Sequence, residues 1–158
     1  MQESATDSIH TPLAKLLRRA PITCPPEEKV AEALRAMREF AVGSIIVASA
    51  DRKPLGILTL RDVVDRVVLE PGALEAPIAR VMTPRPFTLP LQATAYSALL
   101  VMIRQGVRHV VLMDGERLAG VISERDLFGL QSTSMRQLST AIRGAESLPA
   151  IERFGHDI

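Results

Sequence analysis

The sequence repeats itself, and this feature constrains the fold more than any other. The segment Pro21–Pro25 (PITCP) returns as Pro86–Pro90 (PFTLP), so that Pro86 corresponds to Pro21. The same spacing relates an apolar helix face over residues 30–40 to one over residues 95–105. A chain of this kind is expected to fold as two copies of one structural unit.

Each predicted helix is followed by two predicted strands. Runs rich in β-branched residues, typical of buried strands, cover residues 44–47 and 55–58 in the first copy and residues 109–112 and 119–122 in the second. Gly120 corresponds to Gly56, but the spacing between them is one residue shorter than the spacing between the helices. One residue was therefore lost in the turn between the strands, where a length change disturbs few buried contacts. A final short helix, over residues 63–69 or 127–130, completes a unit of about 50 residues, which buries a core alone only with difficulty. We therefore expect an α/β (α+β) fold in which two β-α-β-β-α repeats pack sheet to sheet with pseudo-two-fold symmetry.

Turn residues and composition divide the chain further. Pro71, Gly72 and Pro77 mark a linker between the copies, and short helices are expected just before each copy, over residues 13–19 and 78–82. The predicted organisation is a disordered N-terminus (1–12), a first repeat (13–70), a linker (71–77), a second repeat (78–130) and a C-terminal connector helix with its tail (131–158).

Charge and aromatic content argue against a nucleic-acid partner. Nineteen Lys and Arg residues against 18 Asp and Glu residues leave a formal charge of +1. Phosphate neutralisation needs a basic surface, and single-strand binders use aromatic stacking platforms, whereas this chain has four Phe, one Tyr and no Trp.

The remaining composition predicts a cytoplasmic protein that does not use a membrane or a metal. Cys24 is the only cysteine, so no disulfide can form within the chain, and His10, His109 and His156 lack the spacing of zinc ligands. The start of the sequence lacks the pattern of a signal peptide, and no uninterrupted apolar stretch is long enough to span a bilayer.

Both copies end in the pattern Gly-x-x-[Thr/Ser]-x-x-Asp, which has two interpretations. It reads Gly56-Ile-Leu-Thr59-Leu-Arg-Asp62 in the first copy and Gly120-Val-Ile-Ser123-Glu-Arg-Asp126 in the second. In a structural interpretation the hydroxyl and the acid cap the following helix. In a functional interpretation the helix start and hydroxyl receive a phosphate, the Asp accepts the two hydroxyls of a ribose, and the glycine allows a close approach to the backbone.

The doubled pattern resembles CBS domains, the cystathionine β-synthase type repeats that occur in pairs as Bateman modules. The resemblance covers about residues 13–130, from the opening Pro-x-Thr strand to the final Asp of each copy. It implies a cleft between the repeats that binds an adenosine-containing ligand: AMP, ADP or ATP, or S-adenosylmethionine or cyclic di-AMP. Asp62 and Asp126 would then hold ribose hydroxyls, and Thr59 and Ser123 would bond ribose or phosphate. Residues 22–23 and 87–88 would flank the base.

The copies differ where a phosphate would be met. Arg108 and His109 precede the first hairpin strand of the second copy, as a basic pair does in some nucleotide-binding members, whereas the first copy has Gly43 and Ser44. Two basic side chains would favour a multiply charged ligand. The alternative is that Arg108 is an exposed surface residue and His109 a strand-edge residue whose ring is already bonded.

A second resemblance concerns the wider architecture. The run from Arg108 to Gly115 and the segment 130–138 are similar to bacterial signal-transduction proteins in which a CBS pair precedes a nucleotidyltransferase domain. The chain has no Asp-x-Asp pair of the kind a two-metal transferase needs, so the resemblance implies an output domain absent from this chain, which would be a fragment.

Two functions follow from these observations. The first is a regulatory module, often a homodimer in this family, that binds an adenine nucleotide and relays its occupancy to a partner domain. The second is a non-binding dimerisation scaffold in which the motif residues only cap helices. We expect neither an enzyme nor a prosthetic group, because no nucleophile with a nearby base, no metal set and no paired carboxylates can be assembled.

Overall fold

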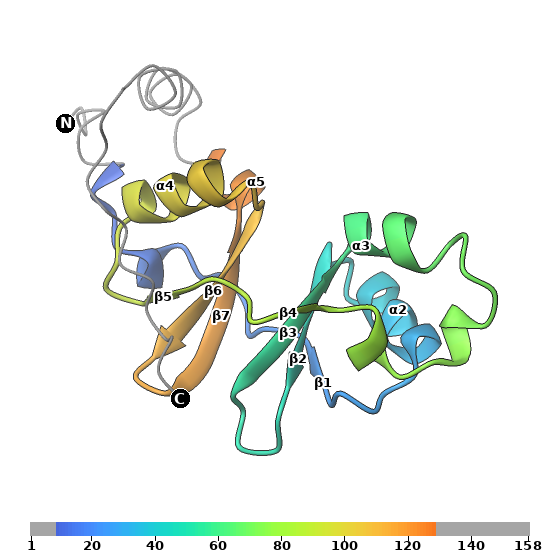
Figure 1. Ribbon diagram of the computed structural model, residues 1–158. Helices are drawn as coiled ribbons and strands as arrows, with labels where there is room; N and C mark the ends of the chain where they lie inside the picture. The colour runs from blue at the N-terminus through green and yellow to red at the C-terminus, as the bar shows by residue number, and fades with distance from the viewer. Residues whose placement is uncertain (1–8, 129–158) are drawn as a thin grey trace. The chain divides into compact units, whose positions relative to one another are not determined.

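The computed structural model describes residues 9–128, which form two compact units (Figure 1). The first-repeat unit comprises residues 20–86 and also includes residues 116–118. The second-repeat unit comprises residues 87–115 and 119–128 together with residues 9–19 from the start of the chain. Each unit contains one small mixed sheet and its own hydrophobic core.

The first-repeat unit is built on a sheet with the strand order β1-β2-β3-β4. β1 (Thr23–Cys24) runs parallel to β2 (Ser44–Ala48), which pairs antiparallel with β3 (Pro54–Thr59), and β4 (Thr83–Pro84) closes the order antiparallel to β3. The parallel pair requires a crossover, which α2 (Val30–Glu39) supplies. α3 (Leu60–Arg66) follows β3 directly, and the 3-10 turns η2 (Ala73–Glu75) and η3 (Ile78–Arg80) lead on to β4.

The core of the first-repeat unit follows from the periodicity of these elements. Val30, Ala33 and Met37 recur at helical spacing on α2 and are buried. They pack with alternate residues of the central strands, among them Ile45 and Val47.

The second-repeat unit uses the same order of elements in a sheet that, within the described residues, has three strands in the order β5-β6-β7. Its elements are β5 (Thr88–Pro90), α4 (Ala95–Gln105), β6 (His109–Asp114), β7 (Arg117–Ser123) and α5 (Glu124–Phe128). α4 begins after Thr94, whose hydroxyl accepts a 3.2 Å hydrogen bond from the Ser97 amide. It ends at Gly106, whose φ of 65° is the left-handed conformation that glycine adopts without strain.

The segment at the start of the chain completes the second-repeat unit rather than the first. Leu13, at the start of the 3-10 turn η1 (Leu13–Lys15), is fully buried in the core formed by α4, β6 and α5. Ile78, its counterpart before the second repeat, is fully buried in the core around α2. We call residues 11–17 and 76–82 the lead-in segments.

The two lead-in segments make equivalent backbone hydrogen bonds. Leu13 N donates to Ala93 O (2.8 Å), as Ile78 N donates to Glu28 O (2.7 Å). In the same way, Ala14 N–Leu91 O (3.0 Å) corresponds to Ala79 N–Pro26 O (3.1 Å), and Ala95 N–Thr11 O (2.9 Å) corresponds to Val30 N–Ala76 O (3.0 Å). Each lead-in segment therefore fixes the loop between an opening strand and its crossover helix.

The structure differs from the sequence predictions at several places. The helix expected over residues 13–19 is only a 3-10 turn of three residues, because Leu13 and Ala14 bond the loop before α4 instead of continuing a helix. The final helices begin earlier than expected, at Leu60 and Glu124, because the motif residues cap them. The predicted disorder of residues 1–12 does not extend to Thr11 and Pro12, which pair with the α4 N-terminus. β4 was not predicted at all, because two residues carry no periodicity.

Other predictions lie outside the described residues. They are the disorder of residues 1–8 and the connector helix and tail over residues 131–158.

Leu13→Ala tests the placement of the N-terminal lead-in segment. Removing this fully buried side chain should destabilise the protein by about 2–5 kcal/mol, since it leaves a cavity in the second-repeat core. In native-state amide exchange, α4 and β6 should exchange faster while α2 changes little. Ile78→Ala is the matched control and should show the reverse pattern, and faster exchange of α2 in Leu13→Ala would contradict the assignment.

Candidate ligand-binding site

The first motif joins β3 to α3 and forms a complete capping box. The Thr59 amide and hydroxyl donate to Asp62 Oδ2 at 2.8 and 2.7 Å, and the Asp62 amide donates to Thr59 Oγ1 at 3.3 Å. The acid and hydroxyl each satisfy a backbone amide that the helix itself leaves unbonded. The capping interpretation is therefore confirmed in this copy.

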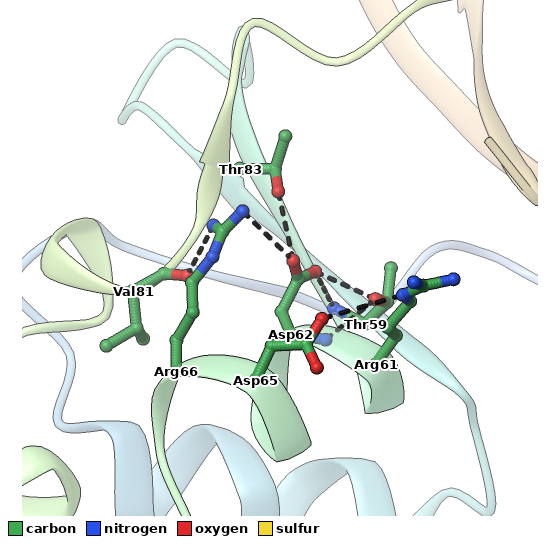
Figure 2. A network of polar contacts seen from close by, with 7 residues as sticks. All are labelled: Thr59, Arg61, Asp62, Asp65, Arg66, Val81 and Thr83. Carbon is green, nitrogen blue, oxygen red and sulfur yellow. Dashed lines mark hydrogen bonds and ion pairs between the residues drawn. The ribbon is translucent and has the colours of Figure 1, made fainter. Parts of the chain in front are cut away.

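Asp62 also holds the strand that follows the linker (Figure 2). Its second oxygen, Oδ1, accepts a 3.1 Å hydrogen bond from the Thr83 hydroxyl of β4 and lies 3.5 Å from Arg66 Nη2. Arg66 in turn donates from Nη1 to the Val81 carbonyl at 3.0 Å. Asp62 is the one charged side chain that is buried among the described residues, and these contacts compensate its charge.

The second motif has the same cap but a different surrounding. The Ser123 amide and hydroxyl donate to Asp126 Oδ2 at 2.8 and 2.6 Å, and the Asp126 amide donates to Ser123 Oγ at 3.3 Å. Asp126 is exposed, in contrast to Asp62. Capping is thus common to both copies, whereas burial of the acid is not.

The motif glycines are explained by packing within the chain. A Cβ atom on Gly56 would overlap the Met82 side chain and reach 3.0 Å from the Thr83 carbonyl oxygen, and one on Gly120 would overlap the Leu17 side chain. The close approach that the sequence suggested is therefore made by the lead-in segments.

The structure places Arg108 next to the second motif. The Glu124 amide donates to the Arg108 carbonyl (2.9 Å), and Arg108 Nε lies 3.8 Å from Glu124 Oε2. This ion pair is weak, because the Arg108 side chain is 78% exposed. In the first copy the Leu60 amide donates to the Gly43 carbonyl (3.1 Å), so glycine and leucine stand in place of the charged pair.

The other predicted contact residues lie at the first position of a strand or just before it. His109 is half-buried at the first position of β6. The carbonyl groups of Ile22 and Phe87, expected beside a base, accept backbone bonds from Ile46 (3.0 Å) and Val111 (2.9 Å). Thr23 and Thr88, also expected there, are the first residues of β1 and β5.

An open cavity of about 510 Å³ lies at the end of the first-repeat sheet that is opposite the first motif. It is lined by the end of β1, the residues after it and the β2–β3 turn: Thr23, Cys24, Pro25, Pro26, Glu27, Ala48, Ser49, Ala50 and Arg52. Ser44 of β2 pairs with Thr59, whereas Ala48 pairs with Pro54, so the cavity and the first motif are at opposite ends of the strands.

Burial raises the pKa of the Cys24 thiol to about 11, and the nearby carboxylates Glu28 and Glu27 add to this effect. A thiol that keeps its proton is a poor nucleophile, which agrees with the sequence interpretation of Cys24 as a packing residue.

Residues 9–128 contain no group of three or more His, Cys, Asp or Glu side chains placed to hold a metal ion. No helix in this part of the chain combines the length and the apolar character needed to cross a membrane.

The CBS domain model matches residues 13–69 and 78–132, so the chain belongs to the CBS domain family and contains a tandem pair of these domains. It is 28% identical over 121 residues to an uncharacterised protein of Methanopyrus kandleri, a match that covers 75% of this chain and 62% of that protein. The chain thus spans about three fifths of the length of such relatives.

Two solved structures share the fold. A CBS domain protein of Pyrobaculum aerophilum, solved in complex with AMP, superposes with a TM-score of 0.71 at 24% identity, covering 82% of this chain and 99% of that one. The CBS domain pair of protein MJ0100, solved with 5′-methylthioadenosine and S-adenosyl-L-methionine, has a TM-score of 0.69 at 19% identity and covers 76% and 94%. At these identities the likeness establishes the fold, two α/β repeats that form two small mixed sheets.

The raised pKa of Cys24 predicts slow alkylation. At pH 8 the folded protein should hold about a hundredth of the thiolate of an unperturbed cysteine, because the pKa rises from 9.0 to about 11. The iodoacetamide rate of the folded chain should keep rising above pH 9, whereas that of the urea-unfolded chain levels off there. The unfolded thiol ionises first, so the contribution of Cys24 to stability is present below pH 9 and is lost as the pH rises through 11. Equal rates in both states at pH 8 would contradict the burial.

Proposed function

We propose that this CBS pair is a regulatory module that binds an adenosine-containing ligand, with AMP, ADP and ATP as the first candidates. The observation that carries the proposal is the double occurrence of the capped Gly-x-x-[Thr/Ser]-x-x-Asp motif in a fold shared with proteins solved with AMP or S-adenosylmethionine. The ligand would be exchangeable, not a prosthetic group.

The chemistry of the motif suits a ribose. A carboxylate accepts up to four hydrogen bonds, and a ribose offers two neighbouring hydroxyl donors. The candidate contacts are the motif acids Asp62 and Asp126 for the ribose, the hydroxyls of Thr59 and Ser123 for ribose or phosphate, and Arg108 and His109 for phosphate.

Regulation requires that the ligand bind two arrangements of the protein with different affinity. The lead-in segments are candidates for transmitting such a change, because each connects directly with a motif: Thr83 follows one segment and bonds Asp62, and Leu17 of the other packs on Gly120. The output domain and the cytoplasmic location remain predictions.

A scaffold without a ligand is the second candidate. The capping bonds favour it, since in both copies the motif hydroxyl and acid already have a structural role. The two functions are separated by ligand binding.

A homodimer is expected for both candidate functions, the ligand-binding module and the scaffold. Leu60, Val64 and Val68 recur at helical spacing along α3 and just beyond it, and they are 60%, 61% and 64% exposed. An apolar stripe of this kind is unusual on a surface that faces water alone. We propose that the stripe lies in the interface of a homodimer.

A thermal-shift series tests the ligand. AMP, ADP, ATP and S-adenosylmethionine are each added to the full chain, and a ligand at about 100 times its dissociation constant should stabilise the fold by about 2.7 kcal/mol. Inosine monophosphate is a control for the base. The absence of a shift with every adenosine compound would favour the scaffold.

Val64→Lys tests the interface. A charge in the middle of the stripe should convert a dimer into a monomer at micromolar concentration, as measured by sedimentation velocity, because an unpaired buried charge is costly. Asp65→Asn, which alters a 58% exposed side chain on the same helix, is the matched control and should remain dimeric. If Val64→Lys sediments as the wild type does, the interface lies elsewhere.

A further inference from the structure

The two motif acids differ in how many of their acceptor positions are filled. All four positions of Asp62 are used: Thr59 contributes two donors to Oδ2, and Thr83 and Arg66 approach Oδ1. Asp126 receives two donors on Oδ2 from Ser123, and within residues 9–128 no further donor approaches its Oδ1. Only the second motif thus presents a carboxylate oxygen with room for two more hydroxyls.

Two positions of the sequence repeat differ in the same sense. In the alignment of the copies that matches Asp62 with Asp126, Leu130 stands where the first copy has Arg66, so the basic partner is replaced by an apolar residue. In the alignment of the lead-in segments, Arg18 stands where Thr83 does. Leu17 and Met82 pack on equivalent glycines, so the residues after them, Arg18 and Thr83, occupy equivalent positions. Thr83 bonds Asp62, whereas among the described residues Arg18 makes no bond to Asp126.

The two acids also differ in burial, and this difference too favours Asp126 as the acid that a ligand can reach. The Asp62 side chain is 13% exposed and surrounded by its partners, whereas Asp126 is open to solvent. A ribose could reach Asp62 only by displacing Thr83 or Arg66, and it would then replace contacts that the carboxylate already has. At Asp126 it would displace water.

The charges beside the motifs also favour the second motif as the ligand site. Arg108 is bonded through its carbonyl group to the second motif, and within residues 9–128 its guanidinium group has a single ion-pair contact, at 3.8 Å with Glu124. The equivalent position in the first copy is Gly43, which has no side chain to offer a phosphate.

We propose that the two repeats have divided these roles: Asp126 accepts the ribose hydroxyls of the ligand, and Asp62 is a structural carboxylate that fixes β4 to α3. This inference rests on the proposed function, since it names the one motif of the two that receives the nucleoside.

The test measures the coupling between each acid and the ribose diol. The dissociation constants of AMP and of 2′,3′-dideoxy-AMP are determined by calorimetry for the full wild-type chain, Asp126→Asn and Asp62→Asn. In the wild type, loss of the diol should weaken binding by about 10-fold to 100-fold, as expected for hydrogen bonds to a charged acceptor. In Asp126→Asn the ratio of the two constants should fall to about 1–3. In Asp62→Asn the ratio should stay at its wild-type value, even if the weakened fold lowers both affinities. A ratio that collapses in Asp62→Asn but persists in Asp126→Asn would overturn the assignment, as would binding of two AMP molecules per chain with equal diol dependence.

Failure of the proposed function is seen separately. If the wild-type chain binds neither AMP nor the ligands of the thermal-shift series, the nucleotide function falls, and the ribose role of Asp126 falls with it. The structural half is then judged by denaturation: Asp62→Asn should lower the urea midpoint clearly more than Asp126→Asn does, and equal midpoints would contradict the structural role of Asp62.

Discussion

The second repeat depends on three backbone hydrogen bonds made by the start of the chain. Thr11, Leu13 and Ala14 bond the loop that leads from β5 into α4, and Leu13 fills the core beneath α4. Without this segment, the loop would expose unpaired amide and carbonyl groups and the core would lose a fully buried leucine. The repeat that follows the linker is therefore not a self-sufficient unit, although its own strands and helices are complete. The two repeats have similar cores, and each core includes one lead-in segment: residues 76–82 in the first-repeat unit and residues 11–17 in the second-repeat unit.

The two repeats also share one cap in two environments. Thr59 with Asp62 and Ser123 with Asp126 form equivalent bonds to backbone amides, so helix capping alone accounts for the presence of both pairs. The difference arises outside the motif, from the contacts that Thr83 and Arg66 make with Asp62. The motif sequence alone predicts two identical sites. The contacts around the motifs distinguish Asp62, a carboxylate with a structural role, from Asp126, which has open acceptor positions.

Much of the fold could be predicted from the sequence because its signals are local and occur twice. Helix periodicity gave α4 the bounds that the structure shows, and the β-branched runs located the central strands closely. The sequence could not show that Leu13 packs with α4 rather than α2, because both cores are aliphatic and periodicity does not name a partner. It missed β4 for a related reason, since a two-residue strand exists only through its pairing with β3. The positions of the candidate residues followed from the motif, but the burial of Asp62 depends on Thr83, which is 21 residues away.

The division of roles between the acids also bears on how occupancy could be relayed. Asp62 holds Thr83, and only a short stretch of chain separates Thr83 from Phe87, which leads into β5. The first motif thus fixes the chain just before it enters the second-repeat unit. Asp126 belongs to the unit whose core requires the lead-in segment at the start of the chain. A ligand held by Asp126 would therefore act on a unit in which the cap, the N-terminal segment and α4 share one core. The two carboxylates would then have complementary parts. Asp62 would hold β4 in place, so that a ligand bound at Asp126 changes the position of the segment next to it and not of the whole chain.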